Sequence, residues 1–185
     1  MASTFSSSSS AESRHSETTA GNFREDRFLL PDEEQTILSV LGLESTRRRV
    51  DVSEKKDTSA NTDANANTNA CELLRRALTS EAKEWAHDRH VAAGLSTCLM
   101  RLCTRYLLKE KRRGRALDPV ANFHVRNGAS LERLNWMADT SEKGLRMSAG
   151  MMVNYMYRLE RIKDINEAYI NDGTIAASST LRSLL

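Results

Sequence analysis

The stretch that most constrains the fold is residues 94–112, where apolar side chains recur at the spacing of one helix face. Leu95, Cys98, Leu99, Leu102, Cys103, Tyr106 and Leu107 follow the i, i+3, i+4, i+7 pattern, and Arg101, Arg105 and Lys109 fill the other side. Such a stripe has to pack against a hydrophobic core. The sequence therefore predicts a long core helix that ends at Gly114.

The next segment, residues 118–128, reads Asp-Pro-Val-Ala-Asn-Phe-His-Val-Arg-Asn-Gly and carries signals of a strand and a turn. Asp118-Pro119 favours an extended entry, because proline disfavours helical backbone in the residue before it. Strand-favouring residues follow, and Asn127-Gly128 is typical of a tight hairpin turn. We therefore expect His124 near the end of a strand, where a histidine on rigid backbone can donate a proton.

Helices and strands alternate over the rest of the chain. We expect a helix from Pro31 to Gly42, helices at 71–79, after Ser80, at 139–147 and at 174–184, and strands at 131–137 and 151–157. With 118–128 as a third strand paired to 131–137, this order predicts a mixed α/β (α+β) fold with helices packed on an antiparallel-rich sheet. Three strands leave an open edge, which indicates a partner or a missing part of the chain.

Two segments have the composition of chains that do not fold alone. Residues 1–27 are rich in serine and threonine, and residues 45–70 form a low-complexity tract dominated by Asn, Thr, Ala, Asp and Lys. Neither buries enough apolar surface to offset the entropy of ordering. We therefore expect a disordered N-terminus over 1–27 and one domain over 28–185 with an unstructured insertion at 45–70.

The overall charge is nearly balanced, at +2, so nothing indicates nucleic acid as a partner, and no apolar run approaches the length of a membrane span. Cys71, Cys98 and Cys103 lack the spacing of a zinc site and are typical of buried thiols in a reducing compartment. The basic run from Lys109 to Arg115 fits either a solvated helix end or an attractor for a nucleotide phosphate.

One metal-site hypothesis has to be weighed. Glu84, His87 and His90 recur every third residue, and Glu-x-x-His is half of the ligand set in carboxylate-bridged di-iron helix bundles. The second half-site is not found in the sequence. A solvated polar helix face explains these residues better, so the sequence predicts no metal.

Long contiguous motifs in the second half of the chain resemble those of one enzyme family. They are Leu99 to Ala129, with its Pro-Val-Ala-Asn-Phe-His run, then Leu134-Asn-Trp-Met-Ala-Asp, Lys143-Gly144, and Ser148 to Tyr157, which ends in Asn-Tyr-Met-Tyr. These motifs closely resemble the C-terminal part of the malonyl-CoA decarboxylase family. The resemblance is strong over 95–169, looser over 28–94 and absent over 1–27.

The resemblance implies both a fold and a reaction. The fold would be the C-terminal portion of a GNAT (acetyltransferase-like) fold with an incomplete sheet. The reaction would convert malonyl-CoA to acetyl-CoA and carbon dioxide without a metal or an organic cofactor. In this family the histidine of the Pro-Val-Ala-x-Phe-His motif is catalytic, here His124, and the second tyrosine of Asn-Tyr-x-Tyr lines the site, here Tyr157. Asn127 and Asn154 are further candidates for orienting or oxyanion donors.

The family also uses a serine in an upstream, proline-rich Ser-Pro-x-Pro-Gly-Phe loop. The two prolines of this chain are Pro31 and Pro119, so we expect that loop to be missing, together with the helical domain that could mediate homo-oligomers. We therefore expect a truncated malonyl-CoA decarboxylase that is inactive alone. The alternative is a non-catalytic fragment or a module that binds acyl-CoA or a protein partner.

The compartment stays open at this point. Members of the family occur in mitochondria, peroxisomes and the cytosol. The C-terminal Ser183-Leu184-Leu185 differs from the peroxisomal Ser-Lys-Leu signal in its middle residue, and the N-terminus lacks the apolar region of a secretory signal. We therefore expect the mitochondrial matrix, the peroxisome or the cytoplasm.

Overall fold

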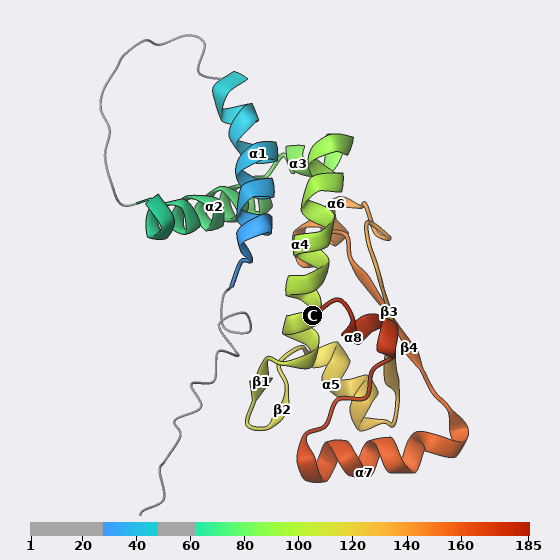
Figure 1. The fold of residues 1–185 in the computed structure, drawn as a ribbon. Coiled ribbons are helices and arrows are strands. Elements are labelled where there is room, and N and C mark those ends of the chain that lie inside the picture. The colour runs from blue at the N-terminus through green and yellow to red at the C-terminus, as the bar shows by residue number, and fades with distance from the viewer. Residues whose placement is uncertain (1–27, 48–61) are drawn as a thin grey trace, which may run out of the picture.

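The structure is a computed structural model that describes residues 28–47 and 62–185 (Figure 1). In chain order the elements are α1 (Pro31–Arg47), α2 (Thr62–Thr79), α3 (Glu84–His87), α4 (Arg89–Leu108), β1 (Lys111–Arg112), β2 (Arg115–Ala116), α5 (Pro119–Arg126), β3 (Ser130–Asn135), α6 (Glu142–Ser148), β4 (Met152–Met156), the 3-10 helix η1 (Leu159–Arg161), α7 (Ile162–Asp172) and α8 (Ser179–Arg182). This mixture of helices and small sheets confirms the predicted mixed α/β class. The expected disorder of residues 1–27 lies outside the described residues.

Helix α4 is the central helix of the molecule, and a separate hydrophobic core forms at each of its ends (Figure 1). At the helical end its first half packs against α1, α2 and α3, with Leu95 and Cys98 in the same cluster as Ile37 and Trp85. At the sheet end Leu107 and Leu108 pack with α5, β3 and α7. The predicted apolar stripe is thus confirmed as core packing.

One position on α4 was expected to face solvent and does not. Arg101 is buried, and its guanidinium donates two hydrogen bonds of 2.6 Å to the buried carboxylate of Glu33 on α1. A third bond, of 2.7 Å, reaches the carbonyl of Phe28. This pair ties the start of α1 to the middle of α4.

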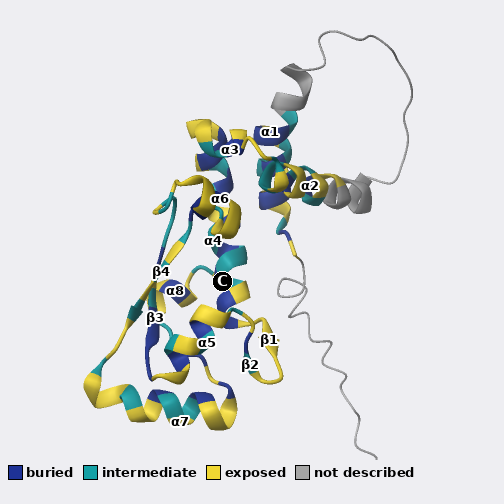
Figure 2. Cartoon of the chain, turned by 180° about the vertical axis from the view of Figure 1, so that it is seen from behind, coloured by how far each residue is buried: buried dark blue, intermediate teal, exposed yellow. Residues whose placement is uncertain are grey.

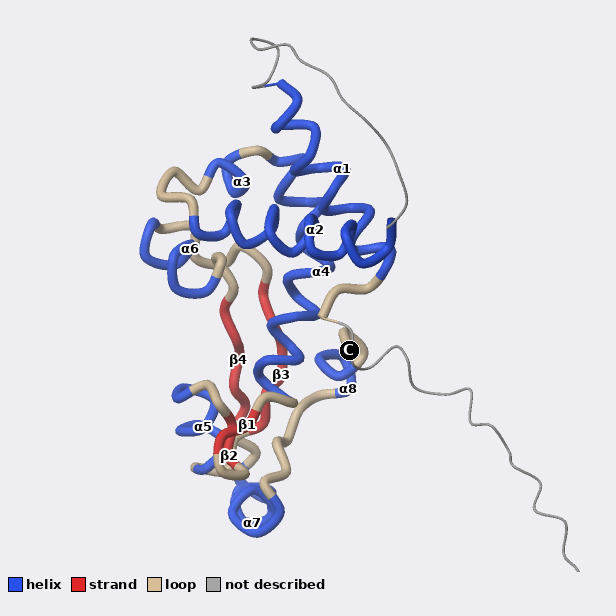
Figure 3. The backbone as a smooth tube through the Cα atoms, turned by 90° about the vertical axis from the view of Figure 1, so that its left-hand side faces the viewer, coloured by secondary structure: helices blue, strands red, loops and turns tan. Residues whose placement is uncertain are grey.

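The sheet at the other end has two long strands. Strands β3 and β4 pair antiparallel, with Leu131 opposite Tyr155 and Leu134 opposite Val153, and a bulge falls between Leu131 and Arg133. Along the outer edge of β3, Leu131 exchanges backbone hydrogen bonds with the segment 176–178. The strands predicted at 131–137 and 151–157 are therefore confirmed, and they pair with each other. Figure 3 shows them side by side below the helical end.

The prediction of a strand at 118–128 was wrong, because these residues form helix α5. The Asp118 side chain caps the helix by accepting from the N–H of Ala121 at 2.7 Å, and Pro119 takes the first helical position. Asn127-Gly128 ends the helix instead of making a hairpin. Gly128 has φ 84°, the left-handed conformation common after a helix C-terminus.

Other boundaries also differ from the sequence prediction. Helix α1 runs through Gly42 to Arg47, and α2 begins at Thr62, inside the tract expected to be unstructured. Helix α4 stops at Leu108, and Gly114 lies in the turn between β1 and β2. Helix α7 was not predicted, and the expected helix at 174–184 shrinks to α8.

Candidate active site

Helix α5 positions the candidate histidine. Its buried side is made by Ala121 and Val125, which are one turn apart and fully enclosed. His124 is next to that side and half-buried, whereas Phe123 is 60% exposed. The helix therefore holds His124 at the boundary between the core and the open surface. Figure 2 shows that α5 carries both buried and exposed residues.

His124 is fixed by two tyrosines of the same strand segment. Its Nδ1 atom lies 2.9 Å from the hydroxyl of Tyr157, a hydrogen-bond distance. Its ring stacks on Tyr155, with the centroids 4.1 Å apart and the planes 18° from parallel. The hydrogen bond fixes the rotation of the imidazole and the stack fixes its plane, so Nε2 is the nitrogen left to face a ligand.

The two tyrosines differ in their surroundings. Tyr157 is 41% exposed, so its hydroxyl can meet both His124 and a ligand. Burial raises the pKa of Tyr155 above its ordinary value, and the nearby negative charge of Asp118 raises it further. Tyr155 thus stays neutral at physiological pH, because both its burial and the negative charge of Asp118 disfavour the ionised form. It serves as an aromatic platform for the His124 ring.

An apolar hollow adjoins this platform. It has a volume of about 690 Å³ and lies between α4, α6 and β4. Tyr155 forms part of its wall, together with Leu99, Leu102 and Val153. A ligand bound in the hollow would therefore touch the same ring that supports His124.

The two candidate asparagines lie apart from each other. Asn127 caps the C-terminus of α5, where its backbone N–H donates to the carbonyl of His124 at 3.1 Å. Asn154 is exposed on the face of β4 opposite Tyr155, and its side-chain oxygen accepts from the amide of Asn135. The structure thus brings His124 and Tyr157 together, while the donor roles of Asn127 and Asn154 stay predictions.

The residues of the metal hypothesis are exposed and belong to two helices. Glu84 and His87 lie on α3, and His90 follows Asp88, whose extended backbone separates α3 from α4. This break removes the single helical face that the hypothesis required. Within residues 28–47 and 62–185 no cluster of three or more Cys, His, Asp or Glu has metal-binding geometry. None of the described helices is long and apolar enough to cross a membrane.

The basic run expected at a helix end forms the hairpin β1–β2 instead. Lys111 donates to the carbonyl of Gly173 at 2.8 Å, and Arg115 donates to the carbonyl of Tyr169 and stacks over its ring. These contacts anchor the hairpin to the end of α7. Two of the cations of this run therefore have structural partners.

The sequence interpretation missed two features of this region. Tyr155 was not named as a candidate site residue, although the Asn-Tyr-x-Tyr spacing places both tyrosines on one face of a strand. Three arginines, Arg158, Arg161 and Arg182, line a second pocket of about 640 Å³. They are spread over 25 positions of the chain, so no local motif reveals them.

Comparison with known proteins gives a consistent result. The family model described as malonyl-CoA decarboxylase C-terminal domain matches residues 33–185. The mitochondrial malonyl-CoA decarboxylase of Rattus norvegicus is 51% identical over 114 residues, which cover 62% of this chain and 23% of the rat protein. That of Mus musculus is 43% identical over 150 residues, which cover 80% of this chain and 29% of the mouse protein. The chain thus spans less than a third of the length of these relatives.

Solved structures agree with this result. A malonyl-CoA decarboxylase from Rhodopseudomonas palustris matches with a TM-score of 0.57 and 38% identity, over 78% of this chain and 30% of the bacterial one. One from Agrobacterium vitis matches with a TM-score of 0.55 and 37% identity, over 68% and 29%. The match of sequence and fold shows that the chain belongs to the malonyl-CoA decarboxylase family and corresponds to its C-terminal domain.

Proposed function

We propose that this chain supplies the histidine half of an active site that decarboxylates malonyl-CoA to acetyl-CoA. The observation that carries the proposal is the His124 imidazole, which is held between the Tyr157 hydroxyl and the Tyr155 ring. We also propose that the two-stranded sheet is part of a larger GNAT (acetyltransferase-like) sheet. The domain would then cover residues 28–185, preceded by the Ser/Thr-rich segment 1–27.

The reaction defines what the site must do. Loss of carbon dioxide from malonyl-CoA leaves an enolate, whose negative charge develops on the thioester oxygen. Positioned hydrogen-bond donors aimed at that oxygen lower the barrier. The carbanion carbon then takes a proton from a general acid, and histidine has a pKa suited to this step near neutral pH. The chemistry needs no electron carrier or metal.

His124 is arranged for both tasks. With Nδ1 accepting a hydrogen bond from the Tyr157 hydroxyl, the neutral ring carries its proton on Nε2. That N–H can donate to the enolate oxygen. Protonation of the carbon calls for the imidazolium form, in which Nδ1–H donates to the Tyr157 hydroxyl oxygen and Nε2 gives up its proton to leave a neutral ring. The stack on Tyr155 prevents rotation of the His124 ring. The N–H donor is therefore already oriented toward the substrate, and no further conformational entropy is lost during the reaction.

The remaining groups would come from a longer polypeptide or from a second chain. The family's proline-flanked serine has no counterpart among the motifs of this sequence. We propose that it is supplied outside residues 1–185 and that malonyl-CoA is the shared substrate. A homo-oligomer built through the family's helical domain, and residence in the mitochondrial matrix like the named mammalian relatives, belong to the same proposal.

A chimera tests this function. Residues 33–185 would replace the matching C-terminal segment of a full-length bacterial relative, and release of labelled carbon dioxide from malonyl-CoA would be measured. We expect the chimera to be active and the isolated chain to be inactive, because the isolated chain lacks the serine loop. Efficient turnover by residues 1–185 alone would overturn the half-site proposal, and a folded but inactive chimera would favour the non-catalytic alternative.

A further inference from the structure

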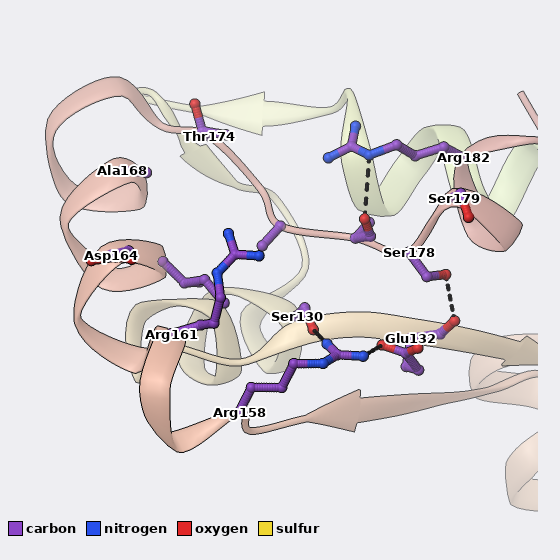
Figure 4. A pocket seen from close by; sticks show the side chains of 13 residues that line it. Ser130, Glu132, Arg158, Arg161, Asp164, Ala168, Thr174, Ser178, Ser179 and Arg182 are labelled. Carbon is purple, nitrogen blue, oxygen red and sulfur yellow. Dashed lines mark hydrogen bonds and ion pairs between the residues drawn. The ribbon is translucent and has the colours of Figure 1, made fainter.

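A second pocket lies at the edge of β3 that faces away from β4. It is an open pocket bordered by β3, the start of α7 and the segment from Thr174 to Arg182, and it has a volume of about 640 Å³ (Figure 4). Its lining contrasts with the apolar hollow beside Tyr155, because arginines and hydroxyls dominate it.

Three arginines converge on this pocket from different elements. Arg158 follows β4, Arg161 lies at the start of α7, and Arg182 ends α8. Figure 4 shows the Arg161 guanidinium directed between α7 and the segment that carries Thr174. Convergence of three cations from separate elements is not a feature of an ordinary solvated helix face.

Two of these arginines are held in place and still have donors to spare. Arg158 donates to the Ser130 hydroxyl at 2.9 Å and to Glu132 at 3.0 Å. Arg182 donates to the carbonyls of Ile175 and Ala177. Each guanidinium has five N–H groups, so about three remain on each of the two for a ligand.

Arg161 differs from the other two. Its side chain is exposed, and none of the described residues accepts a hydrogen bond from it. Two carboxylates also line the pocket, Glu132 and Asp164, and Glu132 is already paired with Arg158. Three arginines against two carboxylates leave one positive charge in excess, which is the sign that attracts an anion.

We propose that this pocket binds a phosphate group. The planar guanidinium fork matches phosphate oxygens in pairs, and the exposed hydroxyls of Thr174 and Ser179 provide further donors at the rim. The phosphate belongs either to coenzyme A, whose 3′-phosphate and pyrophosphate are the anionic part of a coenzyme A thioester, or to a separate phosphorylated ligand. The phosphate site rests on the pocket alone, and only its assignment to coenzyme A rests on the proposed function.

Titration of the full chain by ¹H–¹⁵N NMR at fixed ionic strength tests the site without any turnover. The probes are inorganic phosphate, coenzyme A and dephospho-coenzyme A. We expect saturable shifts at the backbone amides of Arg161 and of residues 174–182. Arg161→Gln should weaken phosphate binding about tenfold, since it removes charge-assisted hydrogen bonds. The matched control Arg146→Gln, exposed on α6 outside the pocket, should leave the affinity within about twofold.

The outcomes separate the two sources of phosphate. Tighter binding of coenzyme A than of dephospho-coenzyme A assigns the pocket to the 3′-phosphate, and a response to inorganic phosphate but not to coenzyme A assigns it to a separate ligand. Absence of a saturable response to all three probes overturns the proposal. Equal weakening by Arg161→Gln and Arg146→Gln does so too, because it would show diffuse attraction by surface charge. An inactive chimera would leave the phosphate site standing.

Discussion

The two ends of α4 use polar groups in opposite ways. At the helical end Arg101 and Glu33 are buried and fully engaged with each other, so their charges serve the fold. At the sheet end His124 and Tyr157 meet at the surface, and three arginines line an open pocket. Helix α4 thus connects a helical end whose buried charges pair with each other to a sheet end whose polar groups are available to a ligand.

This difference separates stability from function along the chain. A polar group that is buried and paired cannot be removed without leaving its partner uncompensated. A polar group at the surface can be changed with little effect on folding. Substitutions in the buried pair Arg101–Glu33 should therefore destabilise the protein, and substitutions at His124 or Arg161 should change only what it binds or catalyses.

The largest effect on stability is expected from Arg101→Ala. The change leaves the Glu33 carboxylate buried without its partner, which costs about 3–5 kcal/mol of unfolding free energy. Urea denaturation measures this cost. The matched control is Arg75→Ala, since Arg75 makes a comparable pair with Glu72 at the exposed surface of α2. We expect the control to denature like the wild type, and equal destabilisation by both variants would break the contrast.

A smaller but clear effect is expected at the turn after α5. In Gly128→Ala the new Cβ would lie 2.5 Å from the carbonyl oxygen of Ile162, at a residue with φ 84°. Strain and overpacking together should cost about 3 kcal/mol. Gly114→Ala has a similar φ of 77° but nothing within 4 Å, so it should cost about 1 kcal/mol. Similar thermal midpoints for the two variants would show that the turn after α5 is not tightly packed against Ile162 at the start of α7.

The smallest expected effect is a difference in the rates at which the cysteine thiols are alkylated. Burial raises the pKa of Cys98, at the helical end, to about 12 and that of Cys103, at the sheet end, to about 11. Below these values both remain neutral thiols, so alkylation should be slow at pH 8 and should accelerate as the pH rises. The half-buried Cys71 should react first and Cys98 last. Mass spectrometry of iodoacetamide-treated native protein gives the order, and fast labelling of Cys98 at pH 8 would show that the helical core opens.

The helical end was more predictable than the sheet end. The stripe on α4 and the start of α1 at Pro31 came from periodicity and from local capping signals, which sequence carries directly. Arg101 was misplaced because its partner Glu33 is 68 positions away, and no local pattern reports such a contact.

The error at 118–128 has a different cause. An Asp-Pro pair is compatible with an extended segment, but also with a helix that begins with an aspartate N-cap and a proline at the first helical position. An Asn-Gly pair is compatible with a hairpin turn, but also with the C-terminal cap of a helix. The spacing of Ala121 and Val125, four apart and both buried, distinguishes the two only once the core is known. His124 could still be proposed as a site residue, because the motif that carries it does not depend on the secondary structure around it.

The most direct test of His124 as the proton donor is the activity of His124→Gln in the chimera with a full-length relative. Glutamine keeps a polar side chain on α5 but cannot act as an acid near neutral pH. We predict a loss of decarboxylation of at least about 100-fold with an unchanged thermal midpoint, while Arg126→Gln, exposed two residues further along α5, stays close to the parent. Near-parental turnover by a folded His124→Gln chimera would contradict the assignment of His124 as the proton donor.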